Sequence, residues 1–230
     1  MTLPPGQRAI GDFPRFGTHM HLRPPEVPAT PVIEIAGAVS GSFAVPLADL
    51  AALPRRELTA DFHCVAGWSA AGLRWEGVPF TAFYREVVEP ALREGEPVTH
   101  LLFRGLDGYR FAVVLEDALA DDVLIAEHLD GRPLDADHGA PVRLVSPSQY
   151  GFVSVKHLCR IEALTAEPPE DYGARLGWVE LGLRFLVSPD RRARVWYEER
   201  HRRLPNWFLR PVYRRLIAPI RFLSARGSPR

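Results

Sequence analysis

The chain has 230 residues, of which 47% are hydrophobic and 24% are charged. This is the composition of an ordinary globular protein with a buried core, and it excludes a disordered chain. No run of 18 apolar residues occurs, so the sequence predicts no membrane-spanning helix. The first residues lack the apolar stretch of an export signal, and two cysteines cannot make a disulfide framework. We therefore expect a cytoplasmic protein.

The formal net charge is zero, but the charges are unevenly distributed along the chain. Residues 1–189 carry a net charge of −9, whereas residues 190–230 contain 12 arginines and carry +9. The pattern predicts a basic extension attached to an acidic domain. Such an extension could dock on its own domain through charge complementarity. It could instead bind a membrane surface, a nucleic acid or a partner protein.

Three regions follow one another along the chain. Residues 1–30 are rich in proline and predict an extended, non-helical lead-in. Residues 31–165 predict a mixed α+β domain, in which strand and helix periodicities alternate. The elements expected in this domain are a hairpin at 32–47, a short helix at 47–53, a strand at 57–66, an amphipathic helix at 79–92, strands at 98–103 and 110–115, a helical turn at 116–119, a strand or helix at 123–129, a turn-rich loop at 130–141, and strands at 142–146 and 156–164.

The third region, residues 166–230, is predicted to be a basic, aromatic-rich helical extension. Pro211 and Pro219 predict short helices rather than one long helix. The mixture is too apolar for a nucleic-acid arm, so we expect its apolar side to pack on the acidic domain or on a second copy. A free apolar side would instead suit anionic lipid or an acidic electron-transfer partner. Apolar residues recur every four positions with arginines between them: Phe208, Val212, Leu216 and Ile220.

Cys64 lies at the end of the predicted strand 57–66 and is followed by Gly67-Trp68-Ser69. A lone free cysteine is most often a small buried hydrophobe. His63 is its neighbour, but alternate residues of a strand point to opposite faces, which weakens a nucleophilic Cys–His pair. Spacing alone therefore does not assign a function to Cys64.

Five ordered motifs, spread over about residues 30–165, give Cys64 a context. Together they resemble the molybdopterin-dependent oxidoreductases of the sulfite oxidase superfamily, which implies a mixed α+β sulfite-oxidase-type fold and Mo-molybdopterin as cofactor. The motifs are residues 62–69 (FHCVAGWS) with 75–78 (WEGV), 107–109 (DGY) with 115–118 (LEDA), 123–134 (VLIAEHLDGRPL), 138–143 (HGAPVR), and 150–156 (YGFVSVK) with 160–162 (RIE).

The resemblance implies that Cys64 is both the catalytic residue and the protein ligand of molybdenum. A soft thiolate suits a metal already held by the two dithiolene sulfurs of the pterin, and the metal would stabilise the deprotonated thiol. The cofactor ends in a phosphate, which requires charged or N–H donors. Arg143 offers a two-pronged guanidinium, and Lys156 with the amides of Ser154 and Val155 could form an anion pocket.

Three histidines complete the implied cofactor site. His138 occupies a position at which relatives hydrogen-bond the pterin, and His19 and His21 would share a face of an extended segment that reaches it.

The residues Arg143, Lys156 and His138 also have plainer interpretations than cofactor binding. Arg143 could be an exposed strand residue and Lys156 a solvated lysine. His138, in the sequence DADHG, could belong to a turn capped by aspartates, and we infer no second metal site there.

The expected activity is transfer of an oxo group to or from a small substrate, with electrons exchanged through a partner protein because no heme or flavin motif is present. Sulfite oxidases have arginines after the ligand cysteine (Cys-Ala-Gly-Asn-Arg-Arg). Here Val-Ala-Gly-Trp-Ser follows Cys64, so we do not expect sulfite as the substrate. Two alternatives are a non-catalytic binding module that keeps the fold but has lost the metal and a hydrolase that uses Cys64. Measuring the molybdenum content of the protein distinguishes the molybdenum enzyme from these two alternatives.

Overall fold

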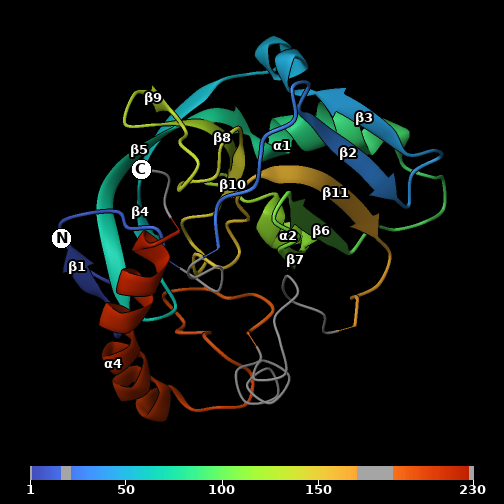
Figure 1. Cartoon of the computed structure of the whole chain (residues 1–230). Coiled ribbons are helices and arrows are strands. Elements are labelled where there is room, and N and C mark those ends of the chain that lie inside the picture. The colour runs from blue at the N-terminus through green and yellow to red at the C-terminus, as the bar shows by residue number, and fades with distance from the viewer. Residues whose placement is uncertain (1, 17–21, 170–188, 228–230) are drawn as a thin grey trace.

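The computed structural model describes residues 2–16, 22–169 and 189–227. In these residues the strands form two sheets, accompanied by short helical segments and one long C-terminal helix (Figure 1). The first sheet is built around the long strand β5 and its neighbour β8. Its members are β1 (Arg8–Ile10), β4 (Arg56–His63), β5 (Trp68–Pro79), β8 (Leu124–Leu129), β9 (Arg132–Pro133) and β10 (Arg143–Val145).

The second sheet has the strand order β3-β2-β11-β6-β7. The expected hairpin at 32–47 is confirmed, because β2 and β3 pair antiparallel with Val32 opposite Pro46. Pro46 ends the edge strand, where its missing N–H disturbs the ladder least. The strands of this sheet are β2 (Val32–Gly37), β3 (Phe43–Pro46), β6 (His100–Gly105), β7 (Arg110–Val114) and β11 (Leu158–Leu164).

The segment predicted as one amphipathic helix at 79–92 is helical but irregular. An α-helical turn, a π-helical turn and a 3₁₀ turn follow one another, and Pro90 lies in the last of them. A proline cannot donate the next helical hydrogen bond, which accounts for the end of the segment. The helical elements are η1 (Leu47–Ala52), α1 (Phe80–Phe83), η2 (Tyr84–Val88), η3 (Glu89–Ala91), α2 (Leu115–Ala118) and α4 (Asn206–Ala225).

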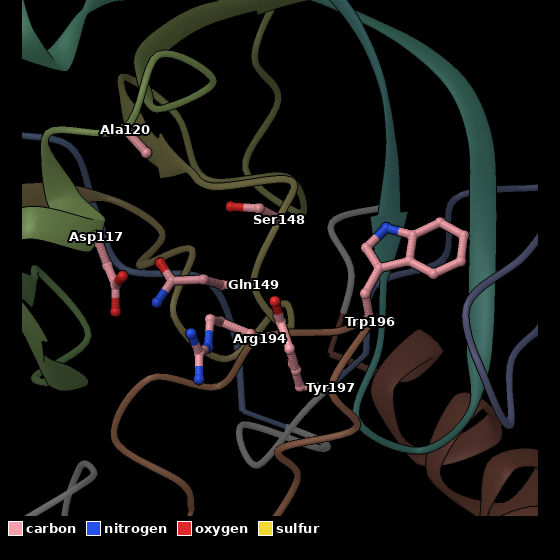
Figure 2. A pocket seen from close by; sticks show the side chains of 7 residues that line it. All are labelled: Asp117, Ala120, Ser148, Gln149, Arg194, Trp196 and Tyr197. Atoms are coloured by element: carbon pink, nitrogen blue, oxygen red, sulfur yellow. The ribbon is translucent and has the colours of Figure 1, made fainter.

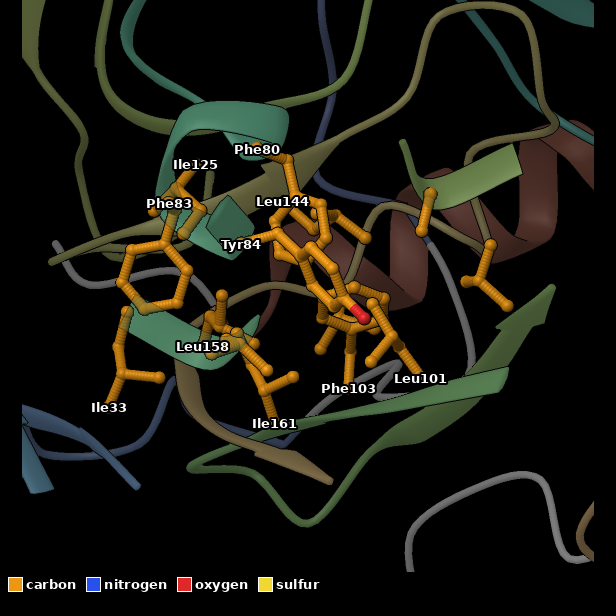
Figure 3. Close-up of a cluster of buried hydrophobic side chains, with 14 of the residues drawn as sticks. Ile33, Phe80, Phe83, Tyr84, Leu101, Phe103, Ile125, Leu144, Leu158 and Ile161 are labelled. Atoms are coloured by element: carbon orange, nitrogen blue, oxygen red, sulfur yellow. The ribbon is translucent and has the colours of Figure 1, made fainter. Parts of the chain in front are cut away.

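Alternation along the first sheet separates two hydrophobic clusters. Ile125 and Leu144 point into the main core, together with side chains of the second sheet and of the helical run (Figure 3). Their neighbours Leu124 and Val145 point to the opposite side, into a second cluster that includes Cys64. Successive side chains of a strand face opposite ways, so one sheet can cover two clusters. The candidate site lies on the side of the second cluster.

β5, the longest strand, has no counterpart among the sequence predictions. Its sequence, WSAAGLRWEGVP, contains two glycines and no clean alternation. Gly77 is needed because a Cβ there would come within 2.0 Å of the Ile125 carbonyl oxygen on β8. Close approach of two backbones explains a glycine in a central strand, but the sequence alone does not show which strand is the neighbour.

The prediction of short C-terminal helices is wrong, because α4 runs without interruption through Pro211 and Pro219. Both prolines are exposed, so the carbonyl groups that they leave without a helical donor can bind water. The prediction that the extension docks on the domain is confirmed, but through a different stripe. Tyr213 and Ile217 pack on the second cluster, whereas Phe208 is exposed. Arg221 pairs with Asp12 of the lead-in at 2.6 Å.

The lead-in is extended in its described parts, as predicted, and it also contributes a strand. β1 pairs parallel with β5, so that Arg8 lies opposite Trp68. The segment around His19 and His21 lies outside the described residues.

Candidate functional site

Cys64 sits in a tight turn between β4 and β5, at the strand end that the sequence predicts. The turn is closed by two hydrogen bonds: Gly67 N–H donates to the Cys64 carbonyl, and Cys64 N–H donates to the Trp68 carbonyl, both at 2.9 Å. The thiol is buried with 8% of the residue exposed, and the Ala66 N–H points at its sulfur from 3.5 Å. The turn thus presents a single sulfur to the second cluster.

Burial raises the pKa of the Cys64 thiol to about 12, although the Ala66 N–H and the charge of Arg200 oppose the shift. A nucleophilic cysteine needs a lowered pKa and an adjacent base. The neighbouring His63 does not supply one, since its Nδ1 is hydrogen-bonded to Ser69 Oγ at 2.8 Å. The arrangement therefore does not support the hydrolase alternative.

Aromatic side chains surround the thiol. Phe13 from the lead-in lies 4.9 Å from Phe62 and 5.8 Å from Trp75, measured between ring centroids, and Phe16 lies 5.5 Å from Trp68. The indole N–H groups of Trp68 and Trp75 are buried and have no hydrogen-bond partner in the described part of the chain. Buried donors of this kind are normally satisfied, so the cluster has the donors to bind a polar group.

Arg143 is buried under this cluster rather than exposed on a strand. Its guanidinium donates to the carbonyl oxygens of His138 and Ser154, both at 3.0 Å, and lies over the rings of Phe62 and Trp75 at 5.5 and 5.3 Å. No carboxylate of the described residues pairs with it. Burial accordingly lowers the pKa of Arg143 to about 9. A buried cation without a counter-ion favours an anionic ligand.

Lys156, the one lysine of the chain, is a second cation in the same place. Its ammonium donates to the Asp137 carbonyl at 2.6 Å. Burial lowers the pKa of Lys156 to about 7, and the positive charges of Arg143 and Arg15 lower it further. Asp137 and Asp107 only partly oppose this shift. Lys156 is therefore half-buried and not a freely solvated lysine.

A glycine brings the two cations together. Gly139 has a φ of +108°, and a Cβ there would lie 3.0 Å from Lys156 Cβ and 3.2 Å from Arg143 Cβ. The turn that carries Lys156 is tied to the Cys64 strand, because Gly151 N–H donates to the His63 carbonyl at 2.8 Å. Arg143 therefore borders the cluster that contains the thiol, and Lys156 lies next to Arg143 across Gly139.

The predicted anion pocket made by the amides of Ser154 and Val155 is not present in this arrangement. Ser154 N–H donates to the Gly151 carbonyl at 3.2 Å, and Val155 N–H donates to the Val153 carbonyl at 2.8 Å. The turn closes on itself and uses these donors. Ser154 contributes instead through its carbonyl, which holds Arg143.

His138 belongs to a turn capped by an aspartate, which is one of the two interpretations that the sequence left open. The capped turn is confirmed, because His138 N–H and His138 Nδ1 both lie 2.8 Å from Asp135 Oδ1. The ring also stacks on Phe13 and places Nε2 at 2.8 Å from the Phe13 carbonyl. A cleft of about 510 Å³ opens beside it, within the size range of ligand sites. The cleft is lined by Leu129, Asp130, Arg132, Pro133, Leu134, Asp135 and His138.

Two further arginines at the site were not predicted. Arg15 is buried beside Asp137, with 3.5 Å between Nε and Oδ1, and it lies in the sequence FPRFG just before His19. Arg200 comes from the C-terminal segment and donates to the Val65 carbonyl in the Cys64 turn. Its charge is offset by Glu198, with 3.4 Å between Nε and Oε1. Nothing in the sequence around Arg200 pointed to this contact over 135 residues.

A smaller hollow of about 130 Å³ is shown in Figure 2. Arg194 at its wall is neutralised by Glu199 at 2.6 Å and stacks on Tyr197. Cys64 does not line it, and its volume is below that of most ligand sites. We do not assign the reaction to this hollow.

Comparison with known proteins identifies the family. The model of the oxidoreductase molybdopterin-binding domain matches residues 21–172. The chain belongs to this family. Within the sulfite oxidase superfamily, the chain is 32% identical over 169 residues to the catalytic subunit MsrP of protein-methionine-sulfoxide reductase from Pseudomonas syringae, which covers 66% of this chain and 48% of that protein. It is 32% identical over 184 residues to human mitochondrial sulfite oxidase, covering 69% and 33%.

The fold agrees with that of a solved relative. The sulfane dehydrogenase SoxCD from Paracoccus pantotrophus superimposes with a TM-score of 0.51 at 23% identity, over 59% of this chain and 38% of that one. This confirms the expected sulfite-oxidase-type α+β fold. The chain spans about half the length of the bacterial reductase that it matches. The cofactor of the family is Mo-molybdopterin, and the thiol, the buried cations and the unpaired indole donors form a suitable set for it.

Proposed function

We propose that the chain is a mononuclear molybdenum oxidoreductase in which Cys64 binds the metal. The observation that carries this proposal is a pair of adjacent cations, the buried Arg143 and the half-buried Lys156, which form no ion pair with a carboxylate of the described residues. Arg143 lies over Phe62 and Trp75 of the cluster that contains the thiol. Buried charges are costly unless they are paired, so an anionic group must be expected beside them. The phosphate and dithiolene groups of molybdopterin provide such charge.

The residues of the chain have separate tasks in this proposal. The Cys64 turn fixes one sulfur in position, since both of its closing hydrogen bonds come from the backbone. Arg143 and Lys156 bind the anionic part of the cofactor, with Arg15 as a third positive charge. His138 holds the lead-in by its bond to the Phe13 carbonyl and orients the pterin side of the site. His19 and His21 belong to the proposed site through the family motif alone.

When bound, the cofactor supplies transfer of an oxygen atom coupled to two-electron exchange between Mo(VI) and Mo(IV). The side chains next to Cys64 are apolar, with Ala66 and Trp68 each 2% exposed, and the charge of Arg200 is offset. This supports a substrate whose oxygen is bound to an apolar group rather than the sulfite dianion. Because one relative is a methionine-sulfoxide reductase, sulfoxides are the first substrates to test. In that direction R₂SO, two electrons and two protons give R₂S and water, with the electrons delivered by a partner protein.

The test is metal and pterin analysis of protein made in a host that synthesises molybdopterin, followed by a turnover screen. Molybdenum equimolar with the chain, and oxidation of reduced methyl viologen by sulfoxides or N-oxides, supports the proposal. Protein that binds neither metal nor pterin supports the non-catalytic binding module. Metal-loaded protein that oxidises aldehydes or sulfite would keep the enzyme class and reverse the direction of transfer. The cytoplasmic location stays a prediction, for cell fractionation to test.

A further inference from the structure

Helix α4 has two different faces. The inner face carries Leu209, Tyr213 and Ile217, which are buried or pack on the Cys64 cluster. Two arginines anchor this side: Arg210 pairs with Glu198, and Arg221 with Asp12. Figure 1 shows the helix along the outside of the molecule, beside β1. The opposite face therefore points away from the protein.

This outer face is unusually apolar for a solvent-exposed surface. Nine large hydrophobic side chains are exposed in the described residues, and five of them lie on α4. Residues 208, 212 and 216 follow one another every four positions, so they form one stripe along the helix. Trp207 and Phe222 widen the stripe, with 74% and 61% of their surface exposed. A concentration of this kind marks an interaction surface.

The same face is basic. Residues 206–226 contain five arginines and no acidic residue, and the three that do not anchor the inner side are exposed. Arg214 and Arg215 are exposed, and neither pairs with a carboxylate in the described ranges. Arg226 lies over the ring of Phe222 at 4.4 Å. Aromatic and aliphatic side chains flanked by arginines whose long stems can extend along them are typical of helices that lie in a membrane interface. No helix in the described residues is long and apolar enough to cross a bilayer.

We propose that the outer face of α4 binds the surface of an anionic lipid bilayer. Charge complementarity selects this occupant. Helix α4 and its C-cap, residues 206–226, carry positive charge and no carboxylate, so an anionic surface attracts this side of the protein. A symmetric dimer through the same face would bring Arg214 and Arg215 of two copies together without a counter-charge. The helix of 20 residues, about 30 Å long, lies flat with its stripe in the headgroup region.

The experiment is co-sedimentation of the full-length protein with vesicles of phosphatidylcholine alone or mixed with phosphatidylglycerol. We expect binding to the mixed vesicles that weakens with added salt. Each arginine at an anionic surface contributes roughly fivefold to partitioning, so Arg214→Gln with Arg215→Gln lowers binding about 30-fold. Trp207→Ala with Phe222→Ala lowers it by more than about tenfold, because two buried aromatic side chains are lost.

Matched controls use exposed residues elsewhere. Trp196→Ala with Tyr197→Ala removes the other exposed aromatic pair, and Arg23→Gln with Arg85→Gln removes two exposed arginines. Both controls should bind vesicles like the wild type, and all variants should keep the wild-type melting temperature. The proposal is overturned if the wild type does not sediment with the mixed vesicles, or if the control variants lose as much vesicle binding as the α4 variants. The proposal is also overturned if the wild type forms a dimer and does not bind vesicles, and if Trp207→Ala with Phe222→Ala makes it monomeric. That result assigns the outer face of α4 to a second copy of the chain.

Discussion

The half-buried side chain of Lys156 makes the stability of the cofactor-free protein depend on pH. Its pKa is about 7 in the folded chain and 10.5 as the ordinary value for lysine. Between these values the unfolded chain holds a proton that the folded chain has released. Raising the pH therefore favours folding in this interval, whereas below about pH 7 both states are protonated and the folded state carries the full cost of the buried charge.

The effect is worked out best between pH 7 and pH 9. Integrating the difference in bound protons over this range gives a gain of about 2 kcal/mol in the free energy of unfolding. This value is an upper limit, because Lys156 keeps some exposed surface and water screens its charge. The other shifted groups act outside this window or in its upper part. Burial lowers the pKa of His63 and His157 below 6.5. It raises the pKa of Cys64 and Cys159 from 9.0, so their opposing effect begins near pH 8, where the lowered pKa of Arg143, about 9, begins to act in the same sense as that of Lys156.

The assay is urea unfolding of the cofactor-free protein at pH 7, 8 and 9. Wild type should become more stable with each step, and Lys156→Met should show no such rise, since it keeps the side-chain volume without the charge. Arg85→Met, at an exposed site, is the matched control and should follow the wild type. Protein loaded with the anionic cofactor should lose the slope, because a neighbouring negative charge raises the pKa of Lys156. A flat wild-type profile, or a slope that survives in Lys156→Met, would refute the assigned burial.

Three further changes test other parts of the site. Gly139→Ala should lower the free energy of unfolding by about 1–3 kcal/mol and reduce cofactor loading, because the residue has a φ of +108° and a Cβ would press on Lys156. Gly41→Ala, at an open position, is the control, and equal melting temperatures of the two variants would contradict the close packing at Gly139. Arg143→Ala should reduce cofactor affinity about ten- to hundredfold and also destabilise the fold, since it leaves buried carbonyls unpaired; normal loading would place Arg143 away from the cofactor. Deleting residues 190–230 should lower the melting temperature or the solubility, because buried Val195 and Arg200 are lost; a deletion variant that is equally stable and fully loaded would show that docking is dispensable.

Much of the fold was predictable where local patterns are strong. The hairpin of β2 and β3 has clear alternation and glycine punctuation, and the turn at His138 has its capping aspartate three residues earlier. β5 was missed because Gly77 is required by the close approach of β8, and the sequence does not show which strand is the neighbour. The course of α4 was missed because a proline rule that holds for buried helices is relaxed where the freed carbonyl groups meet water.

The candidate site shows the same division between local and distant information. Cys64 and the segments around Arg143 and Lys156 were identified from ordered motifs. Packing removes these two cations from water, wholly for Arg143 and partly for Lys156, without an ion pair to a carboxylate of the described residues, and no spacing in the sequence indicates this. Arg15 and Arg200 approach the site from opposite ends of the chain, and their local sequences carry no sign of a partner.

Everything proposed for the reaction depends on Cys64 being the protein ligand of molybdenum. The most direct measurement is molybdenum X-ray absorption of the loaded wild type, of Cys64→Ser and of Cys159→Ser. Cys159 is the matched control, because it is the other free cysteine and its sulfur faces the Arg104 carbonyl of the second sheet. We expect one more sulfur neighbour of molybdenum in wild type and in Cys159→Ser than in Cys64→Ser. An unchanged sulfur count in Cys64→Ser, or a lost sulfur in Cys159→Ser, would contradict it.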